Sequence, residues 1–248
     1  PGAGSDLAGL QTKAEDRGDH YLVNGQKVWT SYADEADWIF CLVRTSSESK
    51  HKGISFLLVD MASPGVTTKP ILLFSGYSPF CETFFDDVRV PKDQLVGEVN
   101  RGWDVAKYLL GHEREMISGM GLGGAASLGA QVGPVDDPLL RAEIAAFDVD
   151  SLAFVAMSER FLDQLKAGEA HPAMPSMMKY AGTELKKRRH ELLMAAGGSE
   201  ALEWDGERSR CGKMARDWLR TKANSIEGGT SEIQLNIVAK HILGLPGT

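Results

Sequence analysis

The sequence predicts an α+β protein in which an antiparallel β-domain over residues 1–98 precedes a four-helix bundle over residues 99–248. Before residue 98, short apolar or alternating segments are separated by glycine, serine and proline, which is typical of strands joined by turns. After residue 99, apolar residues recur at spacings of three and four over stretches long enough for the helices of a bundle.

The β-domain is expected to contain a hairpin. The stretch HYLVNGQKVWT (residues 20–30) places Asn24-Gly25 between two alternating segments. Both central residues of a tight hairpin turn need a positive φ, which Asn and Gly tolerate. Four further strands are expected in DWIFCLVRT (37–45), GISFLLVDM (53–61), GVTTKPILL (65–73) and ETFFDDVRV (82–90).

Four periodic stretches predict the helices. The second stretch begins at Asp137-Pro138, a pair suited to an N-cap and a first helical residue, and ends at Gly168. The fourth stretch begins with a capping hydroxyl followed by Glu232, and ends at Gly244 and Pro246. The four stretches are residues 102–131, 138–168, 175–198 and 230–246.

The composition argues against several classes of function. A formal net charge of -7 disfavours a general nucleic-acid binder, which needs a basic surface. The sequence has no run of about 18 apolar residues, so we expect no membrane span. HEREM (112–116) begins like a zinc-protease motif, but Met116 stands where the second histidine belongs. We therefore expect no protein-ligated metal.

The cysteines indicate a reducing compartment. Cys41, Cys81 and Cys211 lie far apart and are odd in number, which is typical of free thiols. We expect a cytoplasmic protein, or a protein of the mitochondrial matrix if its source is eukaryotic. The chain opens directly on the glycine-rich segment PGAGSD, and we expect an N-terminal portion to precede it.

Two motifs each allow two interpretations. GLGGAA (121–126) has the GxGxxA form of a dinucleotide fingerprint, but it lies within a helical pattern, which favours close helix packing. In KVWTS (27–31), Trp29 leaves a strand and two hydroxyls follow it. Taken alone, this motif favours a core tryptophan before a polar turn over a tryptophan that covers a flat cofactor.

Two further segments carry carboxylates. GHERE (111–115) places Glu113 and Arg114 within an expected helix, where a solvated helix face is the simplest interpretation. SIEGGTSEIQ (225–234) is a glycine-rich turn that leads into a helix. Its amides suit carbonyl oxygens or phosphates, and the alternative is a simple capped helix start.

The order of the motifs is more specific than any one of them. PGAGSD, VNGQKVWTS, GISFLLVD, FFDDVRVP, GHER and EGGTSEIQLNIVAKHILGLP follow one another over essentially the whole chain. In this order they resemble the acyl-CoA dehydrogenase family. The resemblance implies a middle domain that is an antiparallel β-barrel-like structure and a C-terminal four-helix bundle. We expect the family's N-terminal helical domain, and the start of the β-domain, to lie outside this chain.

The resemblance also implies a reaction. Members of the family use FAD to oxidise the Cα–Cβ bond of an acyl-CoA thioester to a trans-2-enoyl-CoA. A carboxylate removes the α-proton while the β-hydrogen leaves as a hydride to flavin N5. Hydrogen bonds from a backbone N–H and a flavin ribityl hydroxyl stabilise the enolate that develops on the thioester oxygen.

The resemblance assigns roles to individual residues. Trp29 is similar to the tryptophan that packs on the flavin, and Thr30 and Ser31 match the hydroxyls at its N5 edge. Ser5 matches a residue that touches both FAD and the pantetheine arm of CoA. Residues expected near other parts of FAD are Thr230, Ser231 and Glu232 at the diphosphate, and Gly197 and Gly198 toward the FAD of a neighbouring subunit.

The catalytic base is predicted to be Glu113. Straight-chain members of the family carry a base directly before Gly-Thr-Ser, where this chain has Gly228, with Glu227 one residue earlier. Other members have a small residue there and a base in a helical Glu-Arg pair, which Glu113 and Arg114 match. Glu227 is the second candidate. Gly228 is then expected to offer its amide to the thioester oxygen, and Arg114 to steady the CoA end of the substrate.

One departure from the family pattern leaves alternatives open. QVGPVDDPLLRAE (131–143) stands where many relatives have an Arg-x-x-Phe-Gly stretch, which indicates a divergent branch that includes mixed oligomers. We expect a homotetramer, dimer or heterotetramer, with electron-transferring flavoprotein as the electron acceptor. A non-catalytic subunit of a heteromer and a flavin oxidase or monooxygenase are the alternative functions.

Overall fold

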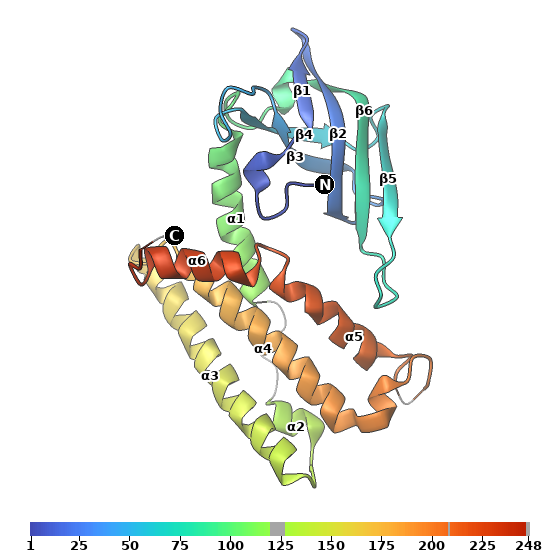
Figure 1. Ribbon diagram of the computed structural model, residues 1–248, viewed down its shortest axis with the longest axis vertical. Coiled ribbons are helices and arrows are strands. Elements are labelled where there is room, and N and C mark those ends of the chain that lie inside the picture. Colours follow the sequence, from blue (N-terminus) through green and yellow to red (C-terminus); the bar gives the residue numbers. More distant parts are fainter. Residues whose placement is uncertain (120–126, 208, 247–248) are drawn as a thin grey trace. The chain divides into compact units, whose positions relative to one another are not determined.

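The computed structural model describes residues 1–119, 127–207 and 209–246 of the chain (Figure 1). The chain forms two compact units, Pro1–Leu110 and Gly111–Thr248, and each is described by itself. The first unit is built around a β-sheet, and the second is helical. The predicted α+β fold class is therefore confirmed.

One six-stranded sheet forms the first unit, with the strand order β4-β3-β1-β2-β6-β5. Neighbouring strands pair antiparallel except β1 and β3, which meet in parallel at Lys13 and Arg44. Its strands are β1 (Lys13–Asp16), β2 (His20–Ser31), β3 (Trp38–Arg44), β4 (Ile54–Asp60), β5 (Val66–Ile71) and β6 (Phe80–Pro91). The four strands expected after residue 31 are all present, as β3 to β6.

The core of this unit lies between side chains of alternating positions on five strands. It gathers Ala14 from β1, Tyr21 and Val23 from β2, Cys41 and Val43 from β3, Leu57 and Val59 from β4, and Phe85, Val88 and Val90 from β6. Period-two alternation of buried residues is what a sheet with one covered face requires. In β2 this alternation buries Tyr21 and Val23, and in β6 it buries Cys81, Thr83 and Phe85.

The prediction of a hairpin turn at Asn24-Gly25 is wrong. Both residues lie inside the long strand β2, and the turn that joins β1 to β2 is at Gly18, whose φ is 90°. Gly25 has a φ of 146°, and a Cβ there would lie 2.8 Å from the Cα of Thr12. The Asn24 amide donates to the Asp87 carboxylate at 2.8 Å and accepts from the Asp87 N–H at 2.9 Å. The Asn-Gly pair therefore marks a β-bulge against β6, which favours the same residue types as a turn.

Pairing of β2 with β6 is irregular at two places. One register shift lies between Val23 and Gly25, and the second lies between Lys27 and Thr30. Between the shifts, Gln26 pairs with Phe84, and beyond the second shift Thr30 pairs with Cys81. The second shift contains Trp29.

Helix α1 (Gly102–Gly119) runs from the end of the first unit into the second. The other helices of the second unit are α2 (Leu128–Val132), α3 (Pro138–Ala167), α4 (Met174–Gly197), α5 (Lys213–Thr221) and α6 (Ser231–His241). The prediction of one continuous helix over residues 102–131 is wrong, because residue 127 is not helical and α2 begins as a separate helix after it. Ser127 caps α2 by accepting from the Ala130 N–H, and the Asp148 carboxylate accepts from the N–H groups of Leu128 and Gly129.

The predicted start and end of α3 and the predicted start of α6 are confirmed, whereas α6 ends at His241, before Gly244. The Asp137 side chain accepts from the N–H groups of Leu139 and Leu140, and Gly168 takes a left-handed conformation with a φ of 73°. The Thr230 hydroxyl caps α6 by accepting from the Ile233 N–H at 3.3 Å. Helix α5 was not among the four expected helices.

Helix α4 is the centre of the second unit. It contacts α3, α5 and α6, and these helices surround it in Figure 1. Its apolar contacts with α3 use three phenylalanines spaced seven residues apart on α3, which lie on one face of that helix. The buried cluster contains Leu128, Ile144, Phe147, Phe154, Phe161, Met178 and Leu192.

Candidate functional site

Trp29 combines two unusual properties. Its φ is 64°, a left-handed conformation that side chains with a Cβ rarely adopt, and 59% of its surface is exposed. The Phe80 ring meets the Trp29 ring edge-on, with 6.1 Å between the ring centroids. Strained backbone of this kind clusters at functional sites, where the surrounding structure holds it in place. Trp29 is therefore a ring presented at the surface of the unit, and the interpretation as a core tryptophan is wrong.

The two hydroxyls after Trp29 have different environments. Thr30 Oγ1 donates to the carbonyl oxygen of Cys81 at 2.9 Å and lies 2.7 Å from the hydroxyl oxygen of Thr83, so it is bound within the β2–β6 ladder. Ser31, the last residue of β2, is exposed. Of the two, Ser31 is the hydroxyl that a ligand beside Trp29 can reach.

Sequence reasoning did not identify Tyr32 as a member of this region. Its φ is 50° and 59% of its surface is exposed, so a second strained aromatic residue follows the strand end. Its N–H donates to the carbonyl oxygen of Pro79 at 2.9 Å, which holds the backbone there. Nothing in the residue types of YADEAD signals a positive φ, which is a property of the tertiary structure.

Ser5 lies in a bend before the first short 3-10 helix, Leu7–Gly9, and it is exposed. The next residue, Asp6, forms an ion pair with Lys50 at 2.8 Å. Ala8 and Leu10 anchor the segment by packing on Ile54. Ser5 is therefore accessible on a segment that its neighbours fix to the β-unit.

The turn between α5 and α6 contains two consecutive left-handed glycines. Gly228 has a φ of 64° and Gly229 a φ of 89°. A Cβ on Gly229 would lie 2.4 Å from Nε2 of Gln234. Only glycine adopts such conformations without strain, so the local sequence requires Gly-Gly before the cap of α6. We call residues 224–230 the GG turn.

Glu227 is bound by Arg220 of α5 and by Asn224 of the GG turn. Its Oε2 accepts from Arg220 at 2.8 Å, and its Oε1 accepts from the Asn224 amide. Both carboxylate oxygens are therefore engaged by neighbours within seven residues along the chain. This environment is that of a carboxylate that supports a turn.

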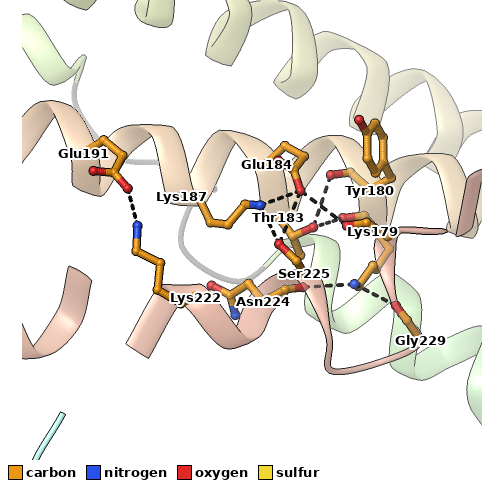
Figure 2. Close-up of polar contacts among 11 residues, drawn as sticks. Lys179, Tyr180, Thr183, Glu184, Lys187, Glu191, Lys222, Asn224, Ser225 and Gly229 are labelled. Carbon is orange, nitrogen blue, oxygen red and sulfur yellow. Dashed lines mark hydrogen bonds and ion pairs between the residues drawn. The ribbon is translucent and has the colours of Figure 1, made fainter. Parts of the chain in front are cut away.

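Lys179 of α4 lies beneath the GG turn and is fully buried. Its ammonium group donates to the carbonyl oxygens of Asn224 at 3.0 Å and Gly229 at 2.8 Å (Figure 2). Burial lowers the pKa of Lys179, and the nearby carboxylates of Glu227 and Glu184 oppose that effect. Sequence reasoning missed this residue, although a lysine within the apolar run MMKYAG is a signal.

The other residues expected near FAD diphosphate lie at the start of α6. Ser231 is buried, and its hydroxyl donates to Glu184 Oε1 at 3.3 Å. Backbone hydrogen bonding at its own N–H, and then the Thr230 hydroxyl, lower the pKa of Glu232. The structure thus brings Glu227, Gly228, Thr230, Ser231 and Glu232 together over the first half of α4.

Gly197 and Gly198 lie at the opposite end of α4. Gly198 has a φ of 55°, and a Cβ on Gly197 would lie 2.8 Å from Ala201 Cβ. Gly197 lies 18 positions after Lys179 in α4, which corresponds to about 27 Å of helix at 1.5 Å per residue. Within one chain, this glycine pair and the GG turn are therefore separate places.

Glu113 lies in α1 and is half-buried. The side chains of Arg114 and Ser118 lie outside the described part of the chain. So do residues 120–126, which contain the GLGGAA motif. Within residues 1–119, 127–207 and 209–246, no helix combines the length and apolar character needed to cross a membrane. Over the same residues, His, Cys, Asp and Glu side chains form no group of three that could hold a metal ion.

Two family models match the chain. The middle domain of acyl-CoA dehydrogenases matches residues 1–88, and the C-terminal domain of acyl-CoA dehydrogenases matches residues 100–243. Among curated relatives, the acyl-CoA dehydrogenase IpdE1 of Mycobacterium tuberculosis is 36% identical over 260 residues. That match covers 99% of this chain but only 65% of the relative, so the chain spans less than two thirds of that relative's length.

Solved structures agree with these matches. The Tcur3481-Tcur3483 steroid ACAD has a TM-score of 0.90 and 28% identity, over 100% of this chain and 67% of that one. The ChsE4-ChsE5 complex from Mycobacterium tuberculosis has a TM-score of 0.81 and 30% identity, over 100% of this chain and 68% of that one. Matched models over both units, and a relative aligned along nearly all of the chain, establish that this chain belongs to the acyl-CoA dehydrogenase family.

Proposed function

We propose that the protein is an FAD-dependent acyl-CoA dehydrogenase that oxidises the Cα–Cβ bond of an acyl-CoA to a trans-2-enoyl-CoA. The observation that carries the proposal is Trp29, an exposed aromatic ring on strained backbone in a member of this family. A folded protein keeps such strain where a ligand uses it. A flat aromatic cofactor is the ligand that an exposed indole ring suits best.

The described residues fit FAD in two places. Trp29 offers an apolar ring face and Ser31 an exposed hydroxyl to the flavin ring system. The amides at the start of α6, after Gly228 and Gly229, suit the negative charges of a diphosphate. When bound, FAD supplies the hydride acceptor of the reaction.

Glu113 is the proposed base that takes the α-proton of the substrate. The alternative, Glu227, is bound on both carboxylate oxygens by Arg220 and Asn224, which supports a structural role for it. Gly228 offers its amide to the thioester oxygen, and Arg114 steadies the CoA end of the substrate. A hydrogen bond to that oxygen stabilises the enolate that develops when the α-proton leaves.

We infer that the acyl group is bulky and carries rings. A relative of known structure is named a steroid ACAD, which is the ground for this inference. The sequence adds that Gly119, Gly121, Gly123 and Gly124 follow Glu113 closely, and residues without a Cβ let a large group approach a backbone. Ser5 is the proposed contact to the pantetheine arm of CoA.

The proposed assembly is an oligomer whose subunits share FAD. The ChsE4-ChsE5 complex consists of two different chains, which supports a mixed tetramer over a homotetramer or dimer here. Gly197 and Gly198 are proposed to approach the FAD of the neighbouring subunit, which agrees with their distance from the GG turn in one chain. Electron-transferring flavoprotein is the proposed electron acceptor, and the cytoplasm the proposed compartment.

We further propose that the middle β-domain extends over residues 1–98 and the helical domain over residues 99–248. Both would occur in a longer protein that carries the whole activity.

The test of the proposed function is to purify that protein, with any partner chain encoded beside it, and mix it anaerobically with a panel of straight-chain, branched and ring-bearing acyl-CoAs. Bleaching of the flavin absorbance by a ring-bearing member, with formation of the enoyl-CoA, is the expected result. A flavin that no acyl-CoA reduces would refute the proposal.

A second function is a non-catalytic subunit that supports an active paralogue. The heteromeric relative is the observation that favours it. Mixing each chain of the complex with a partner that lacks its own base separates the two cases. Flavin bleaching that persists in the complex with an inactive partner assigns the activity to this chain. Rapid reoxidation of the reduced flavin in air would instead indicate an oxidase or monooxygenase.

A further inference from the structure

Lys179 is a buried charge that the proposed reaction does not use. Its side chain is fully inside the helical unit. An ammonium group taken out of water loses its solvation, and strong hydrogen bonds must offset that loss. Its ammonium group donates to two main-chain carbonyl oxygens, those of Asn224 and Gly229. The hydrogen bonds of this buried cation within the described part of the chain therefore hold backbone.

Those two carbonyl oxygens lie on either side of Gly228. Asn224 is four residues before Gly228, and Gly229 follows it directly, so one ammonium group bridges both ends of the GG turn. Gln234 Nε2 donates to the carbonyl oxygens of Gly228 at 3.1 Å and Gly229 at 3.2 Å from the α6 side. The backbone of Gly228 is therefore fixed from α4 and from α6 together.

Glycine pairs need such support. Gly228 and Gly229 both have positive φ, and glycine loses more conformational freedom on ordering than any other residue. Charged donors form stronger hydrogen bonds than neutral ones, so an ammonium group fixes the two carbonyls more tightly than an amide does. Removal of the ammonium group would free the turn in which the Gly228 amide is held.

Other lysines near the GG turn make different contacts. Lys187, two helical turns after Lys179 on α4, contacts the Ser225 hydroxyl and Glu184, and Lys222 contacts Glu191 (Figure 2). These contacts join side chain to side chain and are partly exposed. Lys179 differs because it is buried and binds the main chain on both sides of Gly228.

We propose that Lys179 is a positioning residue that fixes the Gly228 amide in the direction required to bind the thioester oxygen of the substrate. The inference rests on the proposed function. Lys179 does not touch the substrate in this scheme, and it acts through the backbone of the turn. Its loss therefore weakens interactions with the thioester carbonyl more than interactions with the rest of the acyl-CoA.

The experiment compares two CoA ligands in the full-length flavoprotein. One is the acyl-CoA of the panel that reduces the wild-type flavin fastest, and the other is its S-alkyl-CoA thioether, which has a methylene in place of the carbonyl. Lys179→Met removes the donors and keeps the length of the side chain. Lys187→Met is the matched control, because it removes a lysine from the same face of α4 without touching main-chain carbonyls.

We expect Lys179→Met to slow flavin reduction at saturating acyl-CoA by roughly tenfold or more, as loss of a well-placed oxyanion donor does. Thioether binding, followed by the perturbation of the flavin spectrum, should stay within twofold of wild type. Lys187→Met should leave both measurements near wild type. If Lys179 had a general structural role, Lys179→Met would lower both the rate of flavin reduction and the affinity for the thioether. That result would overturn the proposal.

Two further outcomes are decisive. If Lys179→Met cannot be isolated with its flavin, Lys179→Gln, which keeps one amide donor, is measured in the same way. Loss of flavin from both variants assigns Lys179 to folding alone and overturns the proposal. A wild-type flavin that no acyl-CoA reduces refutes the proposed function and this inference with it. A reducible wild type with an unaffected Lys179→Met variant refutes only the inference.

Discussion

In two regions of the molecule the backbone adopts the positive φ angles that glycine favours, and the two regions are held in this conformation by different means. In the β-unit, Trp29 has a φ of 64° within a strand, and the hydrogen bonds of the β2–β6 ladder on each side keep it there. In the helical unit, Gly228 and Gly229 have positive φ in a loop, and the buried side chains of Lys179 and Gln234 hold them. A sheet can hold a strained backbone position through the hydrogen bonds of the neighbouring strand, whereas this loop is held by side chains from two helices.

The largest effect concerns the carboxylate of the GG turn and the carboxylate of α1. Glu113→Gln keeps the shape of the side chain but cannot accept the α-proton. The rate of flavin reduction should fall by roughly 10²–10⁴-fold, as for the loss of a general base. Glu227→Gln should change this rate far less, because Glu227 is bound by Arg220 and Asn224.

Single-turnover bleaching under anaerobic conditions measures both variants, each in the full-length protein. Flavin content serves as the control, since neither change removes a large group. If Glu227→Gln abolished bleaching and Glu113→Gln left it intact, the two roles would have to be exchanged.

The next effect tests whether the β-unit stores strain for a ligand. Trp29→Gly relieves a left-handed conformation that opposes folding by about 1–2 kcal/mol, and it removes the ring. The apoprotein should therefore be no less stable than wild type in urea, while its affinity for FAD falls by roughly tenfold or more. Trp38→Gly is the matched control. Trp38 also lies on a strand and is 53% exposed, but its φ is not positive.

For Trp38→Gly we expect the opposite pattern, with lower stability and unchanged FAD affinity. Glycine within a strand loses about 0.5–1 kcal/mol through its extra freedom in the unfolded chain. Equal losses of FAD affinity in both variants would show that the strained position has no special role.

A smaller effect tests the glycines of the GG turn. Gly229→Ala places a Cβ 2.4 Å from Nε2 of Gln234 at a φ of 89°. We expect a loss of about 1–3 kcal/mol in the free energy of unfolding. Gly244→Ala, at a φ of 64° with open space around its Cβ, should lose less because it has strain without the clash. Urea titration of both variants checks the order, and an equal loss would show that Gln234 yields freely.

The smallest effect separates the two hydroxyls after Trp29. Thr30→Val removes a hydroxyl bound to Cys81 and Thr83, so stability should fall by about 1 kcal/mol. Ser31→Ala changes an exposed residue, so stability should stay within about 0.5 kcal/mol of wild type. Flavin reduction should respond in the reverse order, with the larger loss in Ser31→Ala. A larger kinetic loss in Thr30→Val would reverse the assignment.

Much of the fold could be predicted from local patterns. The four later strands and the caps at Asp137, Gly168 and Thr230 follow from residue types whose preferences are local. The hairpin at Asn24-Gly25 failed because a bulge and a tight turn select the same residues. The pattern cannot tell them apart, since the difference lies in the partner strand β6, about 60 residues further along the chain.

The candidate site was less predictable for the same reason. The position of Glu227 one residue before Gly228 made it the second candidate for the base, but its partners Arg220 and Asn224 are visible only in the folded chain. The apolar run around Lys179 can signal a buried lysine, but it does not reveal the partners of that lysine, which are carbonyl oxygens 45 and 50 residues away in the chain. Interactions with backbone leave almost no trace in a single sequence.

The paired irregularities of β2 have a consequence for insertions and deletions. At the first shift β6 has one residue more than β2, and at the second shift β2 has one residue more than β6, so the register returns to its starting value. Trp29 lies at the shift where β2 has the extra residue, so its deletion would leave the pairs on both sides, Lys27 with Thr83 and Thr30 with Cys81, in place. In the same way, deletion of Asp87 would remove the extra residue of β6 and keep the pairs around the first shift. The two shifts are therefore the places in this ladder where a strand can lose one residue without changing which residues pair on either side.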